Sequence, residues 1–216
     1  MSCNILIHVS ILLWLVIIIW LVDFFIESMI ALTIIEQLAL ISGIKLLLLS
    51  ELMLFISCFW CYLDFRLIGF LLFYFPLLSC YSFSIPFSNP PILVFPSLPI
   101  QCCQILIKIG FLSYSIEGLG QSLSAGFYSI VLQCKEFLYS YFSLTDCLIG
   151  SIYYFTTSLH GIHVLLGSFL FFIIPYYLNL IRNYYFMEFS FSLFLAGYHW
   201  HFVDFIWIIV FVLIIY

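Results

Sequence analysis

Charge is what this sequence has least of. Only 7% of its 216 residues are charged, 66% are hydrophobic, and the mean hydropathy is +1.29. Soluble domains are about one quarter charged, so this chain cannot cover a water-facing surface. Its apolar runs are continuous rather than alternating, which excludes a membrane β-barrel and favours helices that satisfy their own backbone hydrogen bonds. The sequence therefore predicts an all-α, polytopic transmembrane helical bundle.

Basic residues are especially scarce. The chain has five Lys and Arg against ten Asp and Glu, for a net charge of −5. Binding to nucleic acid requires a basic surface, so nucleic acid is excluded as a partner. The shortage of loop cations also leaves the positive-inside rule with too little to assign a membrane orientation.

Motifs for catalysis or metal binding are also missing. There is no thiolate cluster, no HExxH, no pair of carboxylate–His motifs and no Walker or dinucleotide motif. The eight cysteines are scattered through apolar segments, and Cys58 and Cys61 lie in a helix-like run where thiols act as small hydrophobes. We therefore expect no catalytic residue and no metal ligand in this chain.

The apolar runs divide the chain into about six spans of about 20 residues each or longer. We treat residues 1–216 as a single integral membrane domain. Because the N-terminus has no basic region followed by a cleavage site, the first span is expected to remain in the protein. The predicted spans are residues 4–22, 40–62, 92–114, 123–142, 147–178 and 191–216.

The segments between these spans are predicted as surface elements. Residues 23–40 carry Asp23, Glu27, Glu36 and Gln37 among apolar residues, which is typical of an amphipathic surface helix or a helical linker. Residues 79–91 contain three prolines and are predicted as a loop. Residues 117–121 contain two glycines and are predicted as a polar turn before the fourth span.

Glu51 lies near the middle of the second predicted span. An ionised and unpaired carboxylate is costly in hydrocarbon, so the group is expected to be protonated or hydrogen-bonded. Two interpretations remain open. Glu51 either handles protons or contacts lipid, or it makes a hydrogen bond that holds two helices together.

The last two spans carry the remaining intramembrane polar groups. His160 and His163 are three residues apart within HGIHVLLG, and His201 and Asp204 have the same spacing within WHFVDFIW. Residues at this spacing share a helix face, so an Asp–His pair along or across the helices would satisfy both groups. Gly161 is one of the small residues that would let another helix approach closely.

A haem site is the alternative interpretation of these histidines. At about 1.5 Å per residue, His160 and His201 lie at similar depths in two antiparallel spans. A stand-alone membrane protein could hold a haem between His160 or His163 on one helix and His201 on the other.

Several motifs in the same order resemble subunit III of cytochrome c oxidase, the haem–copper terminal oxidase. The strongest are HGIHVLLG and, about forty residues later, WHFVDFIW, which read close to HGxHVxxG and YWHFVDxVW in that family. SELMLFISCFW, beginning at Ser50, places Glu51 on the family's membrane glutamate. The remaining matches are Asp23 with Glu27-Ser28, Asn89-Pro90, Glu117-Gly118, Gln133 with Glu136, and Asp146 with Gly150.

The chain departs from the family pattern in two respects. Members usually have seven spans in a two-helix plus five-helix arrangement with a lipid-filled cleft between them. Matching from Asp23 leaves the family's first helix absent here, so a separate chain could supply its replacement. His199 also stands where the family has tyrosine.

The resemblance implies a subunit without a redox centre or active site of its own. Such a subunit stabilises subunit I, supports its proton uptake and holds phospholipids, within a complex that transfers electrons from cytochrome c to oxygen and pumps protons. Subunits I and II and accessory subunits are the implied partners, haem a and copper belong to those partners, and the location is the mitochondrial inner membrane. Glu51 would face the lipid cleft. The residues that would hold the helices together are His160, His163, His201, Asp204 and Glu136.

Overall fold

The computed structural model describes residues 33–72, 84–140, 143–145, 148–180 and 186–215, together with scattered positions between residues 8 and 23. Apart from short turns, these segments are helical. Most of the predicted span 4–22 and residues 24–32 of the predicted linker 23–40 lie outside the described residues. The prediction of a first span therefore stays untested.

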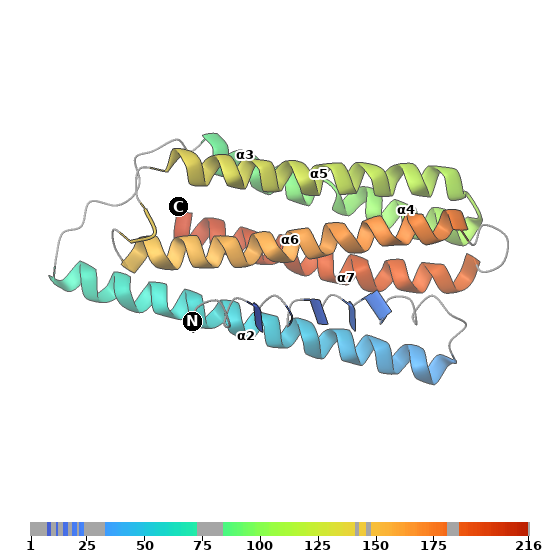
Figure 1. The fold of residues 1–216 in the computed structure, drawn as a ribbon, viewed down its shortest axis with the longest axis horizontal. Coiled ribbons are helices and arrows are strands. Elements are labelled where there is room, and N and C mark those ends of the chain that lie inside the picture. Colours follow the sequence, from blue (N-terminus) through green and yellow to red (C-terminus); the bar gives the residue numbers. More distant parts are fainter. Residues whose placement is uncertain are drawn as a thin grey trace.

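The helices run along one long axis of the molecule (Figure 1). They are α2 (Ile34–Leu72), α3 (Ser84–Val94), α4 (Ser97–Ile109), α5 (Leu112–Tyr139), α6 (Leu148–Leu180) and α7 (Phe186–Val210), which continues into the π-helix η1 (Phe211–Ile215). Four stretches of the described chain are long and apolar enough to cross a membrane: Ile34–Leu67, Phe87–Ile109, Leu148–Tyr176 and Phe191–Leu213. The predicted transmembrane helical bundle is confirmed.

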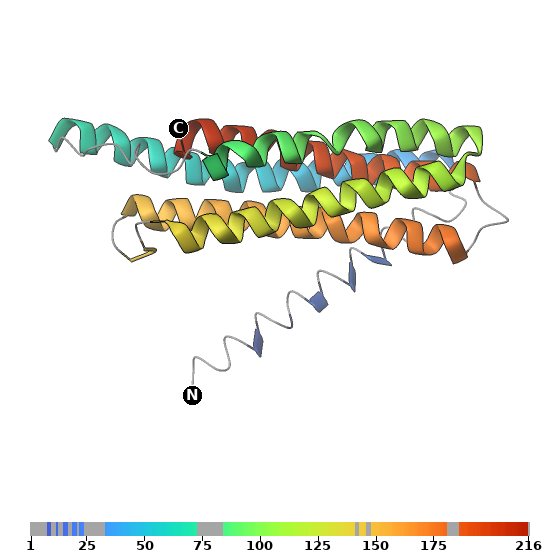
Figure 2. The same ribbon diagram turned by 90° about the horizontal axis from the view of Figure 1, so that it is seen from above.

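The core lies where α4, α5, α6 and α7 pack against one another, with α3 against α5 and α7. Two large rings of α7, Trp200 and Trp207, are fully buried there. α2 contacts α6 and α7 and lies on the side of the bundle away from α5 (Figure 1). Its C-terminal end projects beyond the other helices, which is also visible from above (Figure 2).

α2 begins earlier than the sequence predicts because a capping box starts it at Thr33. The Thr33 backbone N–H donates to the Glu36 carboxylate at 2.7 Å, and the Glu36 N–H donates to the Thr33 hydroxyl at 3.4 Å. Residues 34–39, predicted as part of a surface element, are thus the first turns of α2. The predicted span 40–62 is the middle of a longer helix that continues to Leu72.

The prediction of a loop over residues 79–91 is wrong from Ser84 onward. Residues 84–94 form α3, so Asn89 and Pro90 lie inside a helix. The break comes later, at Phe95 and Pro96, because Pro96 has no backbone N–H with which to continue the helix ladder. The predicted span 92–114 is therefore a kinked pair, α3 followed by α4, that ends at Ile109.

The turn into the next helix is at Gly110 and not at the predicted residues 117–121. Gly110 has a φ of 93°, a left-handed conformation that glycine adopts without a Cβ penalty. Its N–H donates to the Ile107 carbonyl at 3.1 Å, and the Phe111 N–H donates to the Leu106 carbonyl at 2.9 Å. This arrangement closes the end of α4. The fourth helix, α5, therefore begins at Leu112 instead of near residue 123.

The predicted turn at 117–121 is wrong because these residues lie inside α5, where Gly118 serves helix packing. Gly118 lies inside α5 against Cys103 of α4, where an added Cβ would come within 2.6 Å of the cysteine sulfur. α5 is long enough to cross a membrane, but it is less apolar than the other helices because it carries Glu117, Lys135 and Glu136. That α5 crosses stays a prediction.

Candidate functional site

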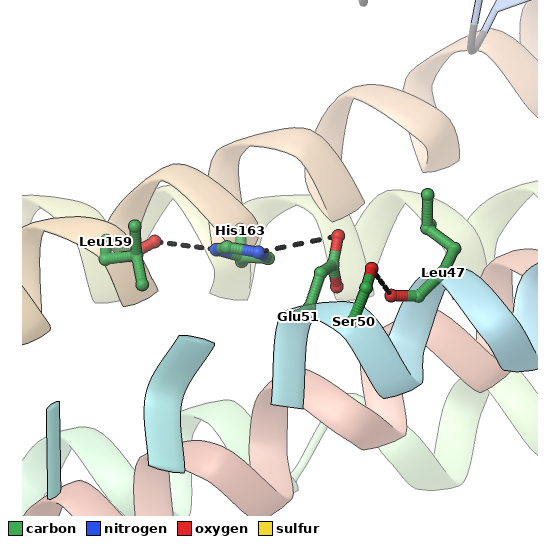
Figure 3. Close-up of polar contacts among 5 residues, drawn as sticks. All are labelled: Leu47, Ser50, Glu51, Leu159 and His163. Carbon is green, nitrogen blue, oxygen red and sulfur yellow. Dashed lines mark hydrogen bonds and ion pairs between the residues drawn. The ribbon is translucent and has the colours of Figure 1, made fainter. Parts of the chain in front are cut away.

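A polar contact between α2 and the rest of the described bundle joins Glu51 to His163 of α6. Glu51 Oε1 lies 3.5 Å from His163 Nε2, and His163 Nδ1 lies 2.7 Å from the Leu159 carbonyl one turn earlier (Figure 3). Both side chains are largely buried, at 21% exposure for Glu51 and 14% for His163. The contact therefore lies largely inside the bundle.

The Leu159 carbonyl determines which nitrogen of His163 carries a hydrogen. A carbonyl oxygen can only accept, so Nδ1 is the donor and Nε2 faces the carboxyl group of Glu51. The Glu51–His163 contact then requires one proton. Either a neutral carboxylic acid donates to Nε2, or a carboxylate accepts from an imidazolium. Chemically, this pair is a site that holds a single proton within a membrane-spanning bundle.

Packing on α2 fixes the position of this pair. Phe55, one turn after Glu51, is buried, and its ring lies 5.4 Å from the His163 ring. Phe59 continues the same face of α2, with its ring 6.2 Å from Phe55. The neighbouring Ser50 donates within its own helix to the Leu47 carbonyl at 2.7 Å and does not compete for Glu51 (Figure 3).

His160 lies deeper in the bundle than His163. It is almost completely buried, and its ring packs on the Trp207 indole of α7 with ring centroids 4.5 Å apart. This contact joins the HGIHVLLG segment of α6 to the WHFVDFIW segment of α7. The two segments that the sequence analysis singled out are thus packed together.

The predicted pairing of His201 with Asp204 does not form in this structure. Asp204 is buried, and its Oδ1 has no hydrogen-bond partner in the described chain, whereas His201 is half-buried at the edge of α7. A shared helix face is not sufficient to bring the two side chains together. The short Asp204 side chain enters the core, whereas His201 stays at its rim.

The geometry does not favour a haem between these helices. Both ring nitrogens of His163 are engaged, one by Leu159 and one by Glu51. His160 is almost completely buried with its ring packed on Trp207, so a porphyrin could reach its nitrogens only if the surrounding side chains moved. Across the described residues, no three His, Cys, Asp or Glu side chains come together as a metal-binding group.

A second polar contact region joins α5 to α6. The Tyr153 hydroxyl donates to the Glu136 carboxylate, and the Gln133 amide donates to the Thr157 carbonyl. Gly161 makes room for Gln133, because an added Cβ there would lie 2.8 Å from its amide oxygen. Glu136 is therefore an interhelical contact in this structure.

The partners of Gln133 and Glu136 were missed by sequence reasoning. Tyr153 and Thr157 are four residues apart on α6, and they lie opposite two polar residues three apart on α5. Matching helical spacings on two consecutive spans were the signal that could have revealed them.

Comparison with known proteins identifies the family of this chain. The sequence profile of the family described as "Cytochrome c oxidase subunit III" matches residues 1–216. The chain belongs to the cytochrome c oxidase subunit III family. The chain is 28% identical over 177 residues to "Cytochrome c oxidase subunit 3" of Drosophila yakuba, covering 80% of this chain and 67% of the relative. It is 31% identical over 181 residues to the protein of the same name from Cyanidium caldarium, covering 82% of this chain and 66% of the relative.

The family assignment confirms the resemblance inferred from the motifs. The chain spans about two thirds of the length of these subunit III relatives. Membership in a subunit family makes this chain a component of a multi-subunit membrane complex. The interhelical contacts described above are the internal framework of that subunit.

Proposed function

We propose that this chain is a non-catalytic core membrane subunit of cytochrome c oxidase, the respiratory complex IV. In this role it stabilises the haem–copper subunit I, supports that subunit's proton uptake and holds phospholipids. The observation that carries the proposal is the family match over residues 1–216, because the family is defined as a subunit of this oxidase.

The distribution of polar and apolar side chains is consistent with a structural subunit of a membrane complex. Gln133 and Glu136 bond across α5 and α6, and Glu51 and His163 meet across α2 and α6, so these groups serve contacts within the chain. The outward side of α2 is apolar and exposed, with Leu46, Met53, Trp60 and Leu67 each at least 58% exposed. Such a face suits lipid tails or an apolar partner helix.

Glu51 supports the proposed roles in lipid contact and proton uptake. Its side chain is 21% exposed at the junction of α2 with the bundle, so part of the side chain reaches the lipid-facing surface while the carboxyl oxygen Oε2 is buried. The other carboxyl oxygen, Oε1, meets His163.

The proposed partners follow from the same assignment. They are subunits I and II, accessory subunits and phospholipids. Haem a and copper belong to the partners, where they carry out the oxygen chemistry. The proposed location is the mitochondrial inner membrane, and among the relatives are animal proteins such as those of Drosophila yakuba and Equus caballus.

The test is native isolation of the chain in mild detergent, with the optical spectrum and the co-purifying polypeptides recorded from the same sample. We expect a haem–copper subunit and an a-type spectrum to accompany the chain. Isolation of the chain alone with stoichiometric b-type haem would contradict the proposal. In that case His201→Phe should abolish the haem absorption, as expected for an axial ligand.

A further inference from the structure

His199 on α7 is a buried base that the contacts described so far do not use. It is only 3% exposed, and neither ring nitrogen has a hydrogen-bond partner in the described chain. Its Nδ1 lies over Gly167 of α6, where an added Cβ would come within 3.3 Å of this nitrogen. Burying an imidazole removes its hydration, which costs free energy unless another interaction compensates.

The interaction available to His199 is with the Glu51–His163 pair. The His199 and His163 rings are nearly parallel, at 15°, with centroids 6.3 Å apart. His163 in turn lies 3.5 Å from Glu51 Oε1 through its Nε2, so His163 connects His199 to the Glu51 carboxyl group. The second carboxyl oxygen of Glu51, Oε2, is also buried without a hydrogen-bond partner in the described chain. His160, three residues earlier on α6, is the nearest other histidine in that helix, and its ring packs on Trp207.

We propose that Glu51, His163 and His199 form one proton-binding cluster that holds a single shared proton inside the bundle. α2, α6 and α7 contribute one group each. Without a proton the cluster carries one negative charge, and with two protons it carries one positive charge. With one proton its net charge is zero, which is the state that a low-dielectric interior favours.

The spacing of the two histidines explains why they act as a unit. Two unit charges 6.3 Å apart, at an effective dielectric constant of about 20, alter each other's proton affinity by about a hundredfold. A proton on His163 therefore opposes a proton on His199, while an ionised Glu51 favours either. Groups coupled this strongly titrate together rather than one by one. This inference concerns residues within the chain and does not rest on the proposed function.

The test follows the infrared carbonyl band of protonated Glu51 as a function of pH in the native complex isolated in detergent. Glu51→Gln identifies the band by removing it. The variant His199→Asn cannot bind a proton and is smaller than histidine, so it fits the same space. The measured quantity is the proton concentration at which half of the Glu51 carbonyl band is lost. We expect this concentration to differ at least about tenfold between His199→Asn and the wild type, because the groups of the cluster titrate together.

The matched control is His201→Asn, the same substitution two residues along the same helix at a half-buried position. It should leave the pH dependence of the Glu51 band unchanged. The same pH dependence in wild type and His199→Asn would overturn the proposal, as would equal shifts in both variants.

A reciprocal measurement covers the case in which His199→Asn does not assemble. Coupling between two binding events is mutual, so Glu51→Gln should shift the titration of His199 by a similar factor. The imidazole nitrogen chemical shifts of His199 in histidine-labelled protein report this titration. Unchanged His199 shifts in Glu51→Gln would overturn the proposal.

Discussion

The contribution of each intramembrane polar residue to stability depends on whether a neighbouring helix supplies a hydrogen-bond partner. Glu51 meets His163 and Glu136 meets Tyr153, each across a helix boundary. Asp204, equally intramembrane by sequence, has no bond to His201. A residue's position along a span therefore does not determine its contribution to stability. Substitutions at these sites should lower the free energy of unfolding more where the residue has a partner on another helix.

The Glu51–His163 contact should stabilise the attachment of α2. Glu51→Leu leaves His163 Nε2 without its partner and should lower the free energy of unfolding by about 1 kcal/mol, the scale of an interhelical hydrogen bond in a membrane. Glu51→Gln can still donate to Nε2 and should lose much less. Thermal unfolding of both variants in the same detergent measures the difference. Equal losses in the two variants would contradict this assignment.

His201 and Asp204 should be energetically independent. Because no hydrogen bond or ion pair joins them, a double-mutant cycle with His201→Phe and Asp204→Val should give a coupling energy below about 0.5 kcal/mol. The unfolding free energies of the wild type, the two single variants and the double variant supply the cycle. A coupling of about 1 kcal/mol or more would restore the pairing expected from the sequence.

At the scale of helices, glycines decide how closely α5, α6 and α7 approach. Gly126 of α5 faces both other helices, and an added Cβ there would lie 2.4 Å from Ser168 Oγ and 2.9 Å from the Trp200 ring. Gly167 of α6 receives the same indole, at 3.1 Å from an added Cβ. The three helices therefore meet at these two glycines, next to the buried ring of Trp200.

Gly126→Ala should separate these helices and destabilise the bundle by about 1–3 kcal/mol, the usual cost of an overpacked core. Gly120→Ala is the matched control, because it lies on the same helix with nothing within 4 Å of an added Cβ. The control should be neutral or more stable by up to about 1 kcal/mol, since alanine favours helix over glycine. Melting temperatures that fall equally for both substitutions would contradict the close approach.

The contact between α5 and α6 should depend on an acceptor at position 136. Glu136→Gln keeps an oxygen that accepts from Tyr153, so we expect a small effect on stability. Glu136→Leu removes the acceptor and should cost about 1 kcal/mol. Tyr153→Phe should then cost little in the Glu136→Leu background, which a double-mutant cycle measures. Additive losses would show that the two side chains do not interact.

At the scale of the whole molecule, the arrangement is a packed group of helices with α2 attached along one side (Figure 1). α5 is the least apolar of its long helices, yet it packs between α4 and α6. Several of its polar side chains face these neighbours, so its low hydropathy is compatible with crossing the membrane.

If α5 crosses, its two ends lie on opposite sides. Phe111 precedes α5, Leu144 follows it, and both are exposed. Cysteines placed at these positions should react with a membrane-impermeant maleimide from opposite sides of sealed vesicles, against the background of the native cysteines. Labelling of both from the same side would mean that α5 does not span.

The sequence by itself determined the class of this protein and its family. Long apolar runs with few charges have one physical solution in a membrane, and the ordered motifs around Glu51, His160 and His201 identify subunit III. These properties are readable because they depend on composition and on residues close in the chain. The capping box at Thr33 is equally local and could have been found in the same way.

The tertiary structure alone decided which polar groups meet and what each glycine does. Gly110 makes a turn, whereas Gly118 and Gly126 make helix contacts, although all three are glycines in one stretch of the chain. His163 contacts Glu51, which is more than a hundred residues away in the sequence. Asp204 makes no hydrogen bond to His201, which is only three residues away. Partner choice depends on which helices lie side by side and how each is rotated, and the packing of large buried side chains such as Trp200 and Trp207 sets that rotation.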